Sequence, residues 1–169
     1  MELTTSRLVI VPAGIELLQA VIDRDYVMAG AVQQLTIPPT WPGNPDAVDG
    51  LPIHLGALRA DPSEIPWRIR LVLLNRIAIG SINLKGPPRG GSVEIGWGIV
   101  PAMRRKGFAA EATAAVIGWL QAQPAIHRIT ATIDDANTAS IRVADRVAMR
   151  KTAALHRDLP VYELTGWRA

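Results

Sequence analysis

Residues 93–133 place a strand, a short loop, a helix and a second strand in succession, which strongly limits the possible folds. Val93–Val100 places apolar residues at every second position, which predicts a strand ended by Pro101. Phe108–Gln123 is rich in alanine and stops before a proline, which predicts a helix. Arg128–Ile133 alternates again. Two strands joined through a helix are expected to pair in parallel, because parallel neighbours need a long crossover connection.

Apolar periodicity predicts further elements on both sides of this unit. Before it we expect a strand at 8–11, a helix at Ile15–Ile22, a short helix at Ile53–Ala60, and a hairpin of Trp67–Leu74 and Ile77–Leu84 around an Asn75-Arg76 turn. After it we expect a helix at Thr138–Val147 and a strand at Val161–Thr165. Residues 36–52 hold five of the thirteen prolines, which predicts a long loop of the kind that forms lids and binding loops.

Strands and helices in this order predict a single α/β domain over residues 1–169, with helices on both faces of a mixed sheet. The chain has no cysteine, which excludes disulfides, thiolate metal sites and a cysteine nucleophile. Met1–Arg7 lacks the apolar core of a signal peptide, and no run approaches the roughly 18 apolar residues of a membrane span. We therefore expect a cytoplasmic protein with no membrane contact.

The charge pattern bears on possible partners. The net charge is only +3, and the basic side chains are scattered along the chain. Nucleic-acid binding would require a wider basic face, so we do not expect it. The densest basic group is Arg104-Arg105-Lys106, directly before Gly107 and the predicted helix.

The loop before this helix has features of a phosphate site. The first N–H groups of a helix lack intrahelical partners and carry a partial positive charge, which suits an anion. Gly107 has no Cβ and Ala109 is small, so a diphosphate could approach the backbone, with basic side chains beside it. A plain loop with solvated basic side chains explains the same pattern equally well. The loop lacks the Gly-x-x-x-x-Gly-Lys-Ser/Thr and Gly-x-Gly-x-x-Gly patterns of two common nucleotide sites.

Three groups of residues resemble a known family. Arg104-x-x-Gly107-x-Ala109 resembles the [QR]-x-x-G-x-[GA] motif of the GNAT superfamily of acyl-CoA-dependent N-acetyltransferases. Residues 137–143, Asn-Thr-Ala-Ser-Ile-Arg-Val, resemble the N-x-x-S-[IL]-[RK]-[VL] element of the same superfamily. Residues 3–8 and Ile79–Ile82 resemble the branch that contains the Rim-type ribosomal-protein N-terminal acetyltransferases. The resemblance implies a GNAT-like three-layer α-β-α domain with a mixed, splayed central sheet.

The resemblance also implies a cofactor site for acetyl-CoA as co-substrate, with no metal. Backbone N–H groups would hold the pyrophosphate beside Arg104, and the residues that supply them are Arg105, Lys106, Gly107, Phe108 and Ala109. The backbone of Ile99 and Val100, where the strand splays from residues 128–133, would pair with the pantetheine amides. A bulge at Gly96 or Gly98 would offer an N–H to the oxyanion. Asn137 would bond the pantetheine or only cap its own helix.

Acetyl transfer to an amine needs a base and an acid. Glu94, on the strand that leads to the site, is a candidate base, although a solvated or ion-paired glutamate is an equal alternative. Most family members place a general-acid tyrosine at the position of Ala144. Ser140 is the best replacement, against the alternative of an ordinary first-turn serine. Tyr162 is a weaker candidate, against an ordinary strand aromatic.

Four other positions bear on the acceptor. His54 could bind it, but a core or surface histidine is the favoured interpretation. Trp41 and Trp67 could line the acceptor pocket, although core packing is the simpler expectation. The family's Gly-Phe pair after the last helix is replaced by Ala148 and Met149, which suggests altered packing near the acceptor site.

Three functions remain open at this point. The first is direct acetyl transfer from acetyl-CoA to a primary amine, either a peptide or protein N-terminus or a small amine. The second is a CoA-binding regulatory protein whose catalysis has decayed, which the alanine at position 144 favours. The third is a nucleic-acid-binding domain, which the small net charge disfavours. The sequence carries no code for the acceptor, and a homodimer is a possible assembly because dimers are the commonest one.

Overall fold

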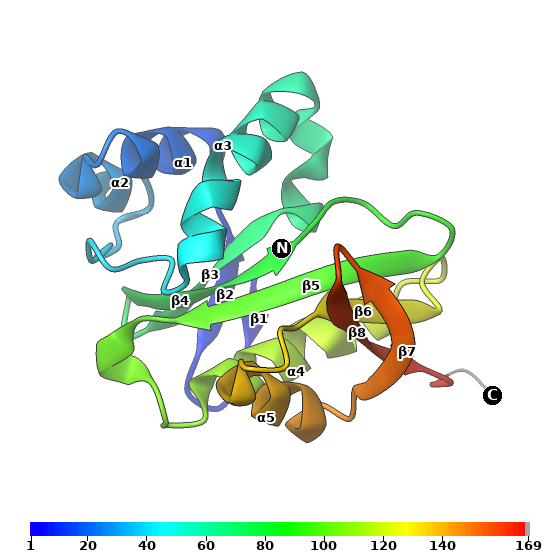
Figure 1. Cartoon of the computed structure of the whole chain (residues 1–169). Helices are drawn as coiled ribbons and strands as arrows, with labels where there is room; N and C mark the ends of the chain where they lie inside the picture. Colours follow the sequence, from blue (N-terminus) through cyan, green and yellow to red (C-terminus); the bar gives the residue numbers. More distant parts are fainter. Residues whose placement is uncertain (168–169) are drawn as a thin grey trace.

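Eight strands form one sheet in the order β1-β2-β3-β4-β5-β6-β8-β7 (Figure 1). The computed structural model describes residues 1–167, apart from the side chains of residues 45 and 46. The strands are β1 (Leu3–Thr4), β2 (Val9–Pro12), β3 (Ile69–Leu74), β4 (Ile77–Leu84), β5 (Ser92–Ile99), β6 (Arg128–Thr132), β7 (Arg150–His156) and β8 (Leu159–Thr165). Strands β5 and β6 pair in parallel, while the other neighbours pair antiparallel.

Helices cover both faces of this sheet, which confirms the predicted three-layer α/β fold. The helices are α1 (Ile15–Ile22), α2 (Tyr26–Gln33), α3 (Pro45–Ala60), α4 (Phe108–Gln121) and α5 (Thr138–Arg146), with short 3₁₀ turns at Pro62–Trp67 and Pro101–Met103. Helices α1, α2 and α3 share one buried apolar cluster with the sheet, and α4 and α5 share a second cluster on its other face. Figure 1 shows the two helical layers on opposite sides of the strands.

Helix α3 begins earlier than predicted, because residues 45–52 are helical rather than part of a loop. Proline is tolerated in the first turn of a helix, so Pro45 starts α3 instead of preventing it. Pro52 lies inside α3 on its exposed side. The buried positions of α3 follow helical spacing: Ala47, Leu51, His54, Leu55 and Leu58. This apolar periodicity was the available signal, and the density of prolines obscured it.

Three elements were not predicted at all. Strand β1 is only two residues long, and α2 is a short helix whose start is capped by Asp25, which accepts from the Met28 N–H at 2.9 Å. Strand β7 lies at the edge of the sheet with nearly every side chain exposed. Apolar alternation arises when one face of a strand is buried, so β7 carries no such pattern.

The predicted hairpin turn is confirmed. Asn75 and Arg76 join β3 to β4 with φ values of +49° and +65°. Positive φ at both central residues is the conformation of a type I′ turn, which matches the twist of two antiparallel strands. The register of β3 and β4 shifts between Val72 and Leu73, because Ile79 is an extra residue on β4.

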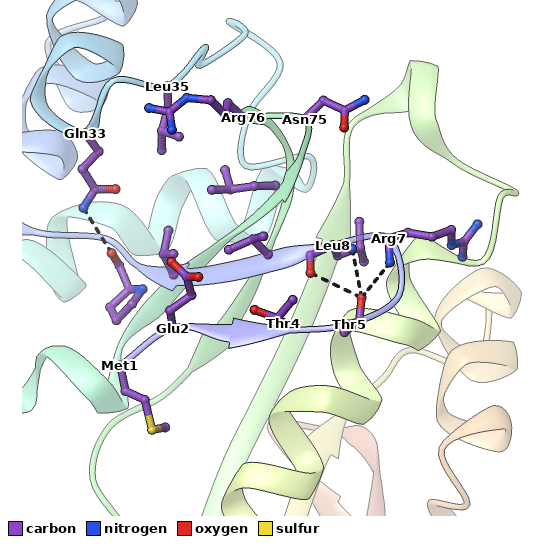
Figure 2. Close-up of a pocket in the computed structure, with 14 residues that line it drawn as sticks. Met1, Glu2, Thr4, Thr5, Arg7, Leu8, Gln33, Leu35, Asn75 and Arg76 are labelled. Atoms are coloured by element: carbon purple, nitrogen blue, oxygen red, sulfur yellow. Dashed lines mark hydrogen bonds between the residues drawn. The ribbon is translucent and has the colours of Figure 1, made fainter.

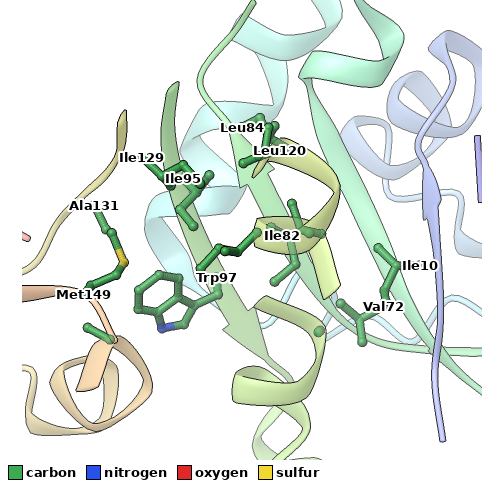
Figure 3. Close-up of a cluster of buried hydrophobic side chains, with 14 of the residues drawn as sticks. Ile10, Val72, Ile82, Leu84, Ile95, Trp97, Leu120, Ile129, Ala131 and Met149 are labelled. Atoms are coloured by element: carbon green, nitrogen blue, oxygen red, sulfur yellow. The ribbon is translucent and has the colours of Figure 1, made fainter. Parts of the chain in front are cut away.

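The parallel pair at the centre of the sheet is short. Strand β5 pairs with β6 only from Ser92 to Glu94, opposite Arg128 to Thr130. The strands then separate, which confirms the expected splay. Apolar side chains of the second cluster, including Trp97, Ile129 and Met149, pack around this region (Figure 3). The splay leaves part of the β5 backbone without a neighbouring strand.

Candidate functional site

A continuous cleft runs along the opening between β5 and β6. Its first cavity, of about 360 Å³, lies between the start of α4 and helix α5 and is lined by Gly107, Ala109 and Val143. The next, of about 280 Å³, shares Ala109 and Val143 with the first and adds Ser140. A third, of about 330 Å³, shares Ser140 with the second and reaches Leu159 on β8. The shared walls connect the helix start to the splay.

The backbone N–H groups at the start of α4 are free. Within residues 1–167, no hydrogen bond uses the N–H of any residue from Arg105 to Ala110. The next N–H, of Glu111, donates to Gly107 O at 3.1 Å and closes the first turn. Gly107 is the N-cap residue and supplies no side chain to satisfy these donors. Free donors combined with the positive end of the helix dipole make this position suited to an anion.

The conformation of Gly107 explains why a glycine stands there. Its φ is +82°, in the left-handed region that other residues adopt at a cost. A Cβ built at Gly107 would meet only Arg7 Nη2, at 3.5 Å, so the protein itself leaves room for one. The requirement for glycine therefore comes from the backbone angle and from whatever occupies the cleft.

The Arg104 side chain makes two hydrogen bonds within the protein. Its Nε donates to Ile99 O at 2.9 Å, and its Nη2 donates to Gly43 O at 3.0 Å. The guanidinium therefore joins the end of β5 to the loop before α3. These two bonds hold two walls of the cleft together, and Nη1 makes no hydrogen bond to any described residue, so Arg104, which lines the first and second cavities, keeps donors for a ligand.

We expected the backbone of both Ile99 and Val100 to be exposed at the splayed edge of β5, but Val100 is hydrogen-bonded within the protein. Val100 N–H donates to Ile79 O at 2.8 Å, and Val100 O accepts from Met103 N–H at 2.9 Å. The prediction that the Val100 backbone is exposed is therefore wrong. Hydrogen-bonded positions alternate along an antiparallel pair, so Trp97 and Ile99 direct their N–H groups away from β4, toward the splay. The backbone N–H groups of Trp97 and Ile99 form the unpaired edge, whereas Ile99 O accepts from Arg104 Nε.

The predicted bulge on β5 is also absent from its pairing with β4, which keeps one register throughout. Gly98 serves close packing instead, because a Cβ there would lie 2.8 Å from Asn44 Cβ and 3.2 Å from Pro42 O. Gly96 faces open space and lines the third cavity. The two glycines thus let the loop before α3 approach β5 and keep the cleft open.

Two polar side chains of the expected Asn–Ser element lie at the middle of the cleft. Asn137 Oδ1 accepts from the Ser140 N–H at 3.1 Å, so this side chain caps α5. The Asn137 amide nitrogen and the Ser140 hydroxyl make no hydrogen bond to any described residue. Both residues line the second and third cavities, where these groups can reach a ligand.

Glu94 lies near the closed end of the splay, half-buried, and is outside the walls of the three cavities. Its Oε1 accepts from Thr132 Oγ1 at 3.2 Å. Thr132 lines the third cavity, and so does Gly96, two residues along β5 on the same face as Glu94. The carboxylate is therefore linked to the cleft through Thr132 rather than exposed in it.

The candidate acids and aromatic residues are mostly in the core. Ala144 is fully buried and Tyr162 is 4% exposed, both in the apolar cluster beneath α4 and α5. Trp41 is buried, with Nε1 donating to Gly80 O at 2.7 Å. Trp67 is half-buried at the edge of the core and packs on Trp119, with ring centroids 5.0 Å apart and the ring planes tilted by 38°. Core packing, the simpler expectation for the two tryptophans, is confirmed.

His54 is a core residue of α3. Its side chain is 5% exposed, and its Nδ1 has no partner among the described residues. Burial, with smaller contributions from Arg68 and Lys85, lowers the pKa of His54 to about 4. The imidazole is therefore neutral at physiological pH, and it lines none of the cavities along the cleft.

Two arginines on α5 were missed as candidates. Arg142 and Arg146 are one helical turn apart, and both line the first cavity opposite the free N–H groups. Arg142 belongs to the element that resembles the family motif, and its spacing from Arg146 was the available signal. Together with Arg105 they give this end of the cleft a positive charge.

A second hollow, of about 610 Å³, lies elsewhere on the molecule. It is lined by β1, β2, the end of α2 and the β3–β4 turn, and it shares no residue with the cleft (Figure 2). Gln33 Nε2 donates there to Pro12 O at 3.4 Å. Its walls include no row of free N–H groups comparable to that of α4, so the cleft remains the candidate functional site.

Among residues 1–44 and 47–167, no three histidine, aspartate or glutamate side chains gather as a group that could hold a metal ion. In the same part of the chain, no helix has the length and apolar character needed to cross a bilayer.

An open mixed sheet with a splay beside a free helix N-terminus defines a class of α/β proteins that can hold an extended ligand with an anionic end. The family model described as an acetyltransferase (GNAT) domain matches residues 7–150, and the chain belongs to this family. An uncharacterised N-acetyltransferase of Bacillus subtilis (strain 168), YnaD, is 34% identical over 67 residues, or 40% of this chain and 39% of YnaD. The match thus spans about two fifths of that relative's length.

Two solved structures are similar along nearly the whole chain. RimL, described as a ribosomal L7/L12 α-N-protein acetyltransferase in complex with coenzyme A, has a TM-score of 0.68 at 14% identity, covering 98% of both chains. RimJ of Mycobacterium smegmatis, in complex with a CoA disulfide, has a TM-score of 0.63 at 20% identity, covering 94% of this chain and 81% of that one. At these identities the comparison supports the fold.

Proposed function

We propose that this protein transfers an acetyl group from acetyl-CoA directly to a primary amine. The observation that carries the proposal is the row of free N–H groups from Arg105 to Ala110 at the mouth of an open splay. A diphosphate matches those donors, and an extended pantetheine arm matches the unpaired edge of β5. Membership of the GNAT family supports the same ligand.

In this proposal each part of acetyl-CoA occupies its own part of the cleft. The diphosphate lies on the N–H groups from Arg105 to Ala110, with Arg142 and Arg146 facing it from α5. The pantetheine follows the β5 edge at Ile99, and the Asn137 amide nitrogen donates to it. The thioester then lies beside Trp97 and Ser140, which share the walls of the second and third cavities.

Transfer requires a neutral amine that attacks the thioester carbonyl carbon. The new N–C bond forms as the C–S bond breaks, and the carbonyl oxygen carries negative charge in between. The backbone N–H of Trp97, directed into the splay, stabilises that oxygen. Glu94 accepts a proton from the incoming ammonium through Thr132 or a water. Ser140 gives a proton to the leaving thiolate and takes in its place the proton that the attacking nitrogen loses as the amide forms.

The acceptor enters from the third cavity, on the side of β8. Asp134 and Leu159 line this entrance, so a cationic amine with an apolar neighbour fits its walls. Both a peptide N-terminus and a small primary amine meet this description. The names of RimL and RimJ favour the first, because RimL is described as an α-N-protein acetyltransferase. We keep the cytoplasm as the proposed compartment and a homodimer as a proposed assembly.

The test is acetyl-CoA turnover followed with a thiol-trapping reagent across a panel of peptides and small amines. The proposal expects release of free CoA that depends on the amine. Calorimetric binding of CoA without turnover on any amine would instead support a CoA-binding protein whose catalysis has decayed. Absence of CoA binding would contradict the site itself.

A further inference from the structure

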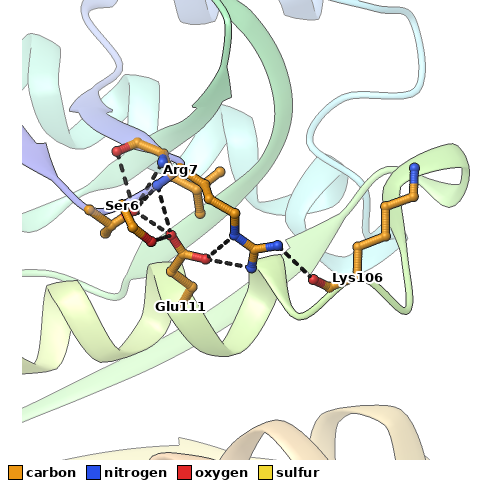
Figure 4. Close-up of polar contacts among 6 residues, drawn as sticks. Ser6, Arg7, Lys106 and Glu111 are labelled. Atoms are coloured by element: carbon orange, nitrogen blue, oxygen red, sulfur yellow. Dashed lines mark hydrogen bonds and ion pairs between the residues drawn. The ribbon is translucent and has the colours of Figure 1, made fainter.

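The segment between β1 and β2 lies against the first turn of α4, about a hundred residues later in the chain. Thr5 Oγ1 donates to Glu111 Oε1 at 2.6 Å, and Arg7 Nε donates to Glu111 Oε2 at 2.7 Å (Figure 4). Burial alone would raise the pKa of Glu111, but the hydrogen bonds from Thr5 and Arg7 and the charge of Arg7 lower it overall. Glu111 is thus a charged anchor that holds Arg7 beside the loop.

The Arg7 guanidinium contacts three successive residues of that loop. Its Nη1 donates to Lys106 O at 3.1 Å. Its Nη2 lies 3.5 Å from the position a Cβ would take on Gly107. Its carbon lies 4.5 Å from the centre of the Phe108 ring, in a cation–π contact. One planar group therefore fixes the carbonyl, the turn and the first helical residue together.

We infer that Arg7 is a positioning residue that directs the Gly107 N–H into the cofactor cleft. In a trans peptide the C=O and the following N–H point in opposite directions. The cis bond among the described residues is Trp41–Pro42, so the Lys106–Gly107 bond is trans. Because Arg7 holds Lys106 O on one side, Gly107 N–H is directed to the other. This inference rests on the proposed function, since directing the Gly107 N–H into the cleft matters only if a diphosphate binds there.

A loop of this kind needs such a restraint. Glycine populates positive and negative φ with similar ease, so the Lys106–Gly107 peptide plane can flip at a small free-energy cost. In the flipped state Lys106 O, rather than Gly107 N–H, would face the anion and repel it. The bond from Arg7 stabilises the productive orientation before the ligand arrives, which lowers the ordering cost of binding.

Arg7 acts through the backbone and not by touching the ligand. It lines none of the three cavities along the cleft. A lysine at this position keeps the positive charge but has a single ammonium, which cannot hold Glu111 and Lys106 O in the planar geometry of a guanidinium. Arg7→Lys thus removes the hydrogen-bond geometry of the guanidinium while keeping the positive charge at position 7.

The experiment compares two acetyl donors in Arg7→Lys and in the wild type. Acetyl-CoA carries the diphosphate, and acetylpantetheine lacks it. For acetyl-CoA we expect KM to rise about 10-fold to 100-fold with kcat nearly unchanged, as for a lost hydrogen bond to a charged group. For acetylpantetheine we expect KM to change less than about twofold, because no diphosphate meets Gly107.

The matched control is Arg128→Lys. Arg128 pairs with Glu163 at 2.9 Å and is exposed to a similar degree, with 41% of its side chain accessible against 45% for Arg7. The Arg128→Lys variant should leave the KM values for acetyl-CoA and for acetylpantetheine unchanged. If Arg7→Lys is too unstable to assay, Glu111→Gln weakens the same anchor, and a smaller rise restricted to acetyl-CoA is expected.

Three results would overturn the inference. A variant with unchanged KM for acetyl-CoA would show that Arg7 does not act on the loop. An equal loss with both donors would assign Arg7 a general structural role. A wild-type protein that binds no CoA would overturn the proposed function, and this inference with it.

Discussion

At the scale of single residues, Gly107 is the position where the backbone angle disfavours a side chain and where the proposed diphosphate would leave no room for one. Gly107→Glu would force a φ of +82° on a residue with a Cβ and place a carboxylate among the N–H groups proposed to bind the diphosphate. We expect CoA binding to fall below detection by isothermal titration calorimetry. The control is Gly118→Glu, on the exposed side of α4 with no atom within 4 Å of the built Cβ. Equal CoA affinity in the Gly107 variant would contradict the site.

Glu94 is a second residue whose role can be isolated. Glu94→Gln keeps a side chain that can accept from Thr132 but removes the base, so turnover should fall about 100-fold or more. The affinity for CoA should stay near the wild-type value, because Glu94 lies outside the cavity walls. Steady-state kinetics and calorimetry measure the two quantities. Full turnover in this variant between pH 6 and pH 9, roughly the range where a tuned base titrates, would remove Glu94 from the mechanism.

At the scale of elements, the start of α5 combines a structural bond with a proposed ligand bond in one side chain. Asn137 Oδ1 caps the helix at Ser140 N–H, and its amide nitrogen is free for pantetheine. Asn137→Asp keeps the cap and removes the donor, so the free energy of unfolding should hold while KM for acetyl-CoA rises. Asn137→Ala loses both, and unfolding should become easier by about 1 kcal/mol.

Urea denaturation and donor kinetics on the same two variants separate these effects. If both variants leave KM unchanged while the alanine variant alone loses stability, Asn137 is a cap and nothing more.

The loop before α3 and the end of β5 are likewise held together by one side chain, since Arg104 donates to both Gly43 O and Ile99 O. Both bonds hold elements that are distant in sequence at the edges of one cleft.

At the scale of the whole molecule, a buried neutral imidazole makes stability depend on pH. The pKa of His54 is lowered to about 4 from 6.5, mainly by burial, so an unfolded chain takes up this proton before the folded one does. Stability is therefore complete above about pH 6.5 and is lost as the pH falls toward 4, by about 3 kcal/mol from this group.

The variant His54→Leu isolates that contribution, because leucine fills a core position of α3 without titrating. We expect the difference in unfolding free energy between pH 7 and pH 4.5 to be smaller in the variant, measured by urea denaturation. Other acidic groups titrate alike in both proteins. An identical pH dependence would mean that His54 is protonated or exposed in the folded state.

Local chemistry explains which parts of the fold the sequence could predict. Period-two alternation in β5, the Asn75-Arg76 turn and the glycine before α4 depend on residues within a few positions of one another. The splay was expected from the family resemblance and is confirmed by the short pairing of β5 with β6. In α3, Pro45 obscured a helical pattern that packing against the sheet completes.

The sequence by itself determined the strand–loop–helix unit, the α/β class and the family, because each rests on local periodicity or on a short motif. Only the tertiary structure decided which donors are free. Val100 N–H is used by Ile79 on a neighbouring strand, and the Arg104 side chain is used by two carbonyls. Arg7 reaches Lys106 O from the far end of the chain. Hydrogen-bond partners are set by distance in space, which one-dimensional spacing does not record.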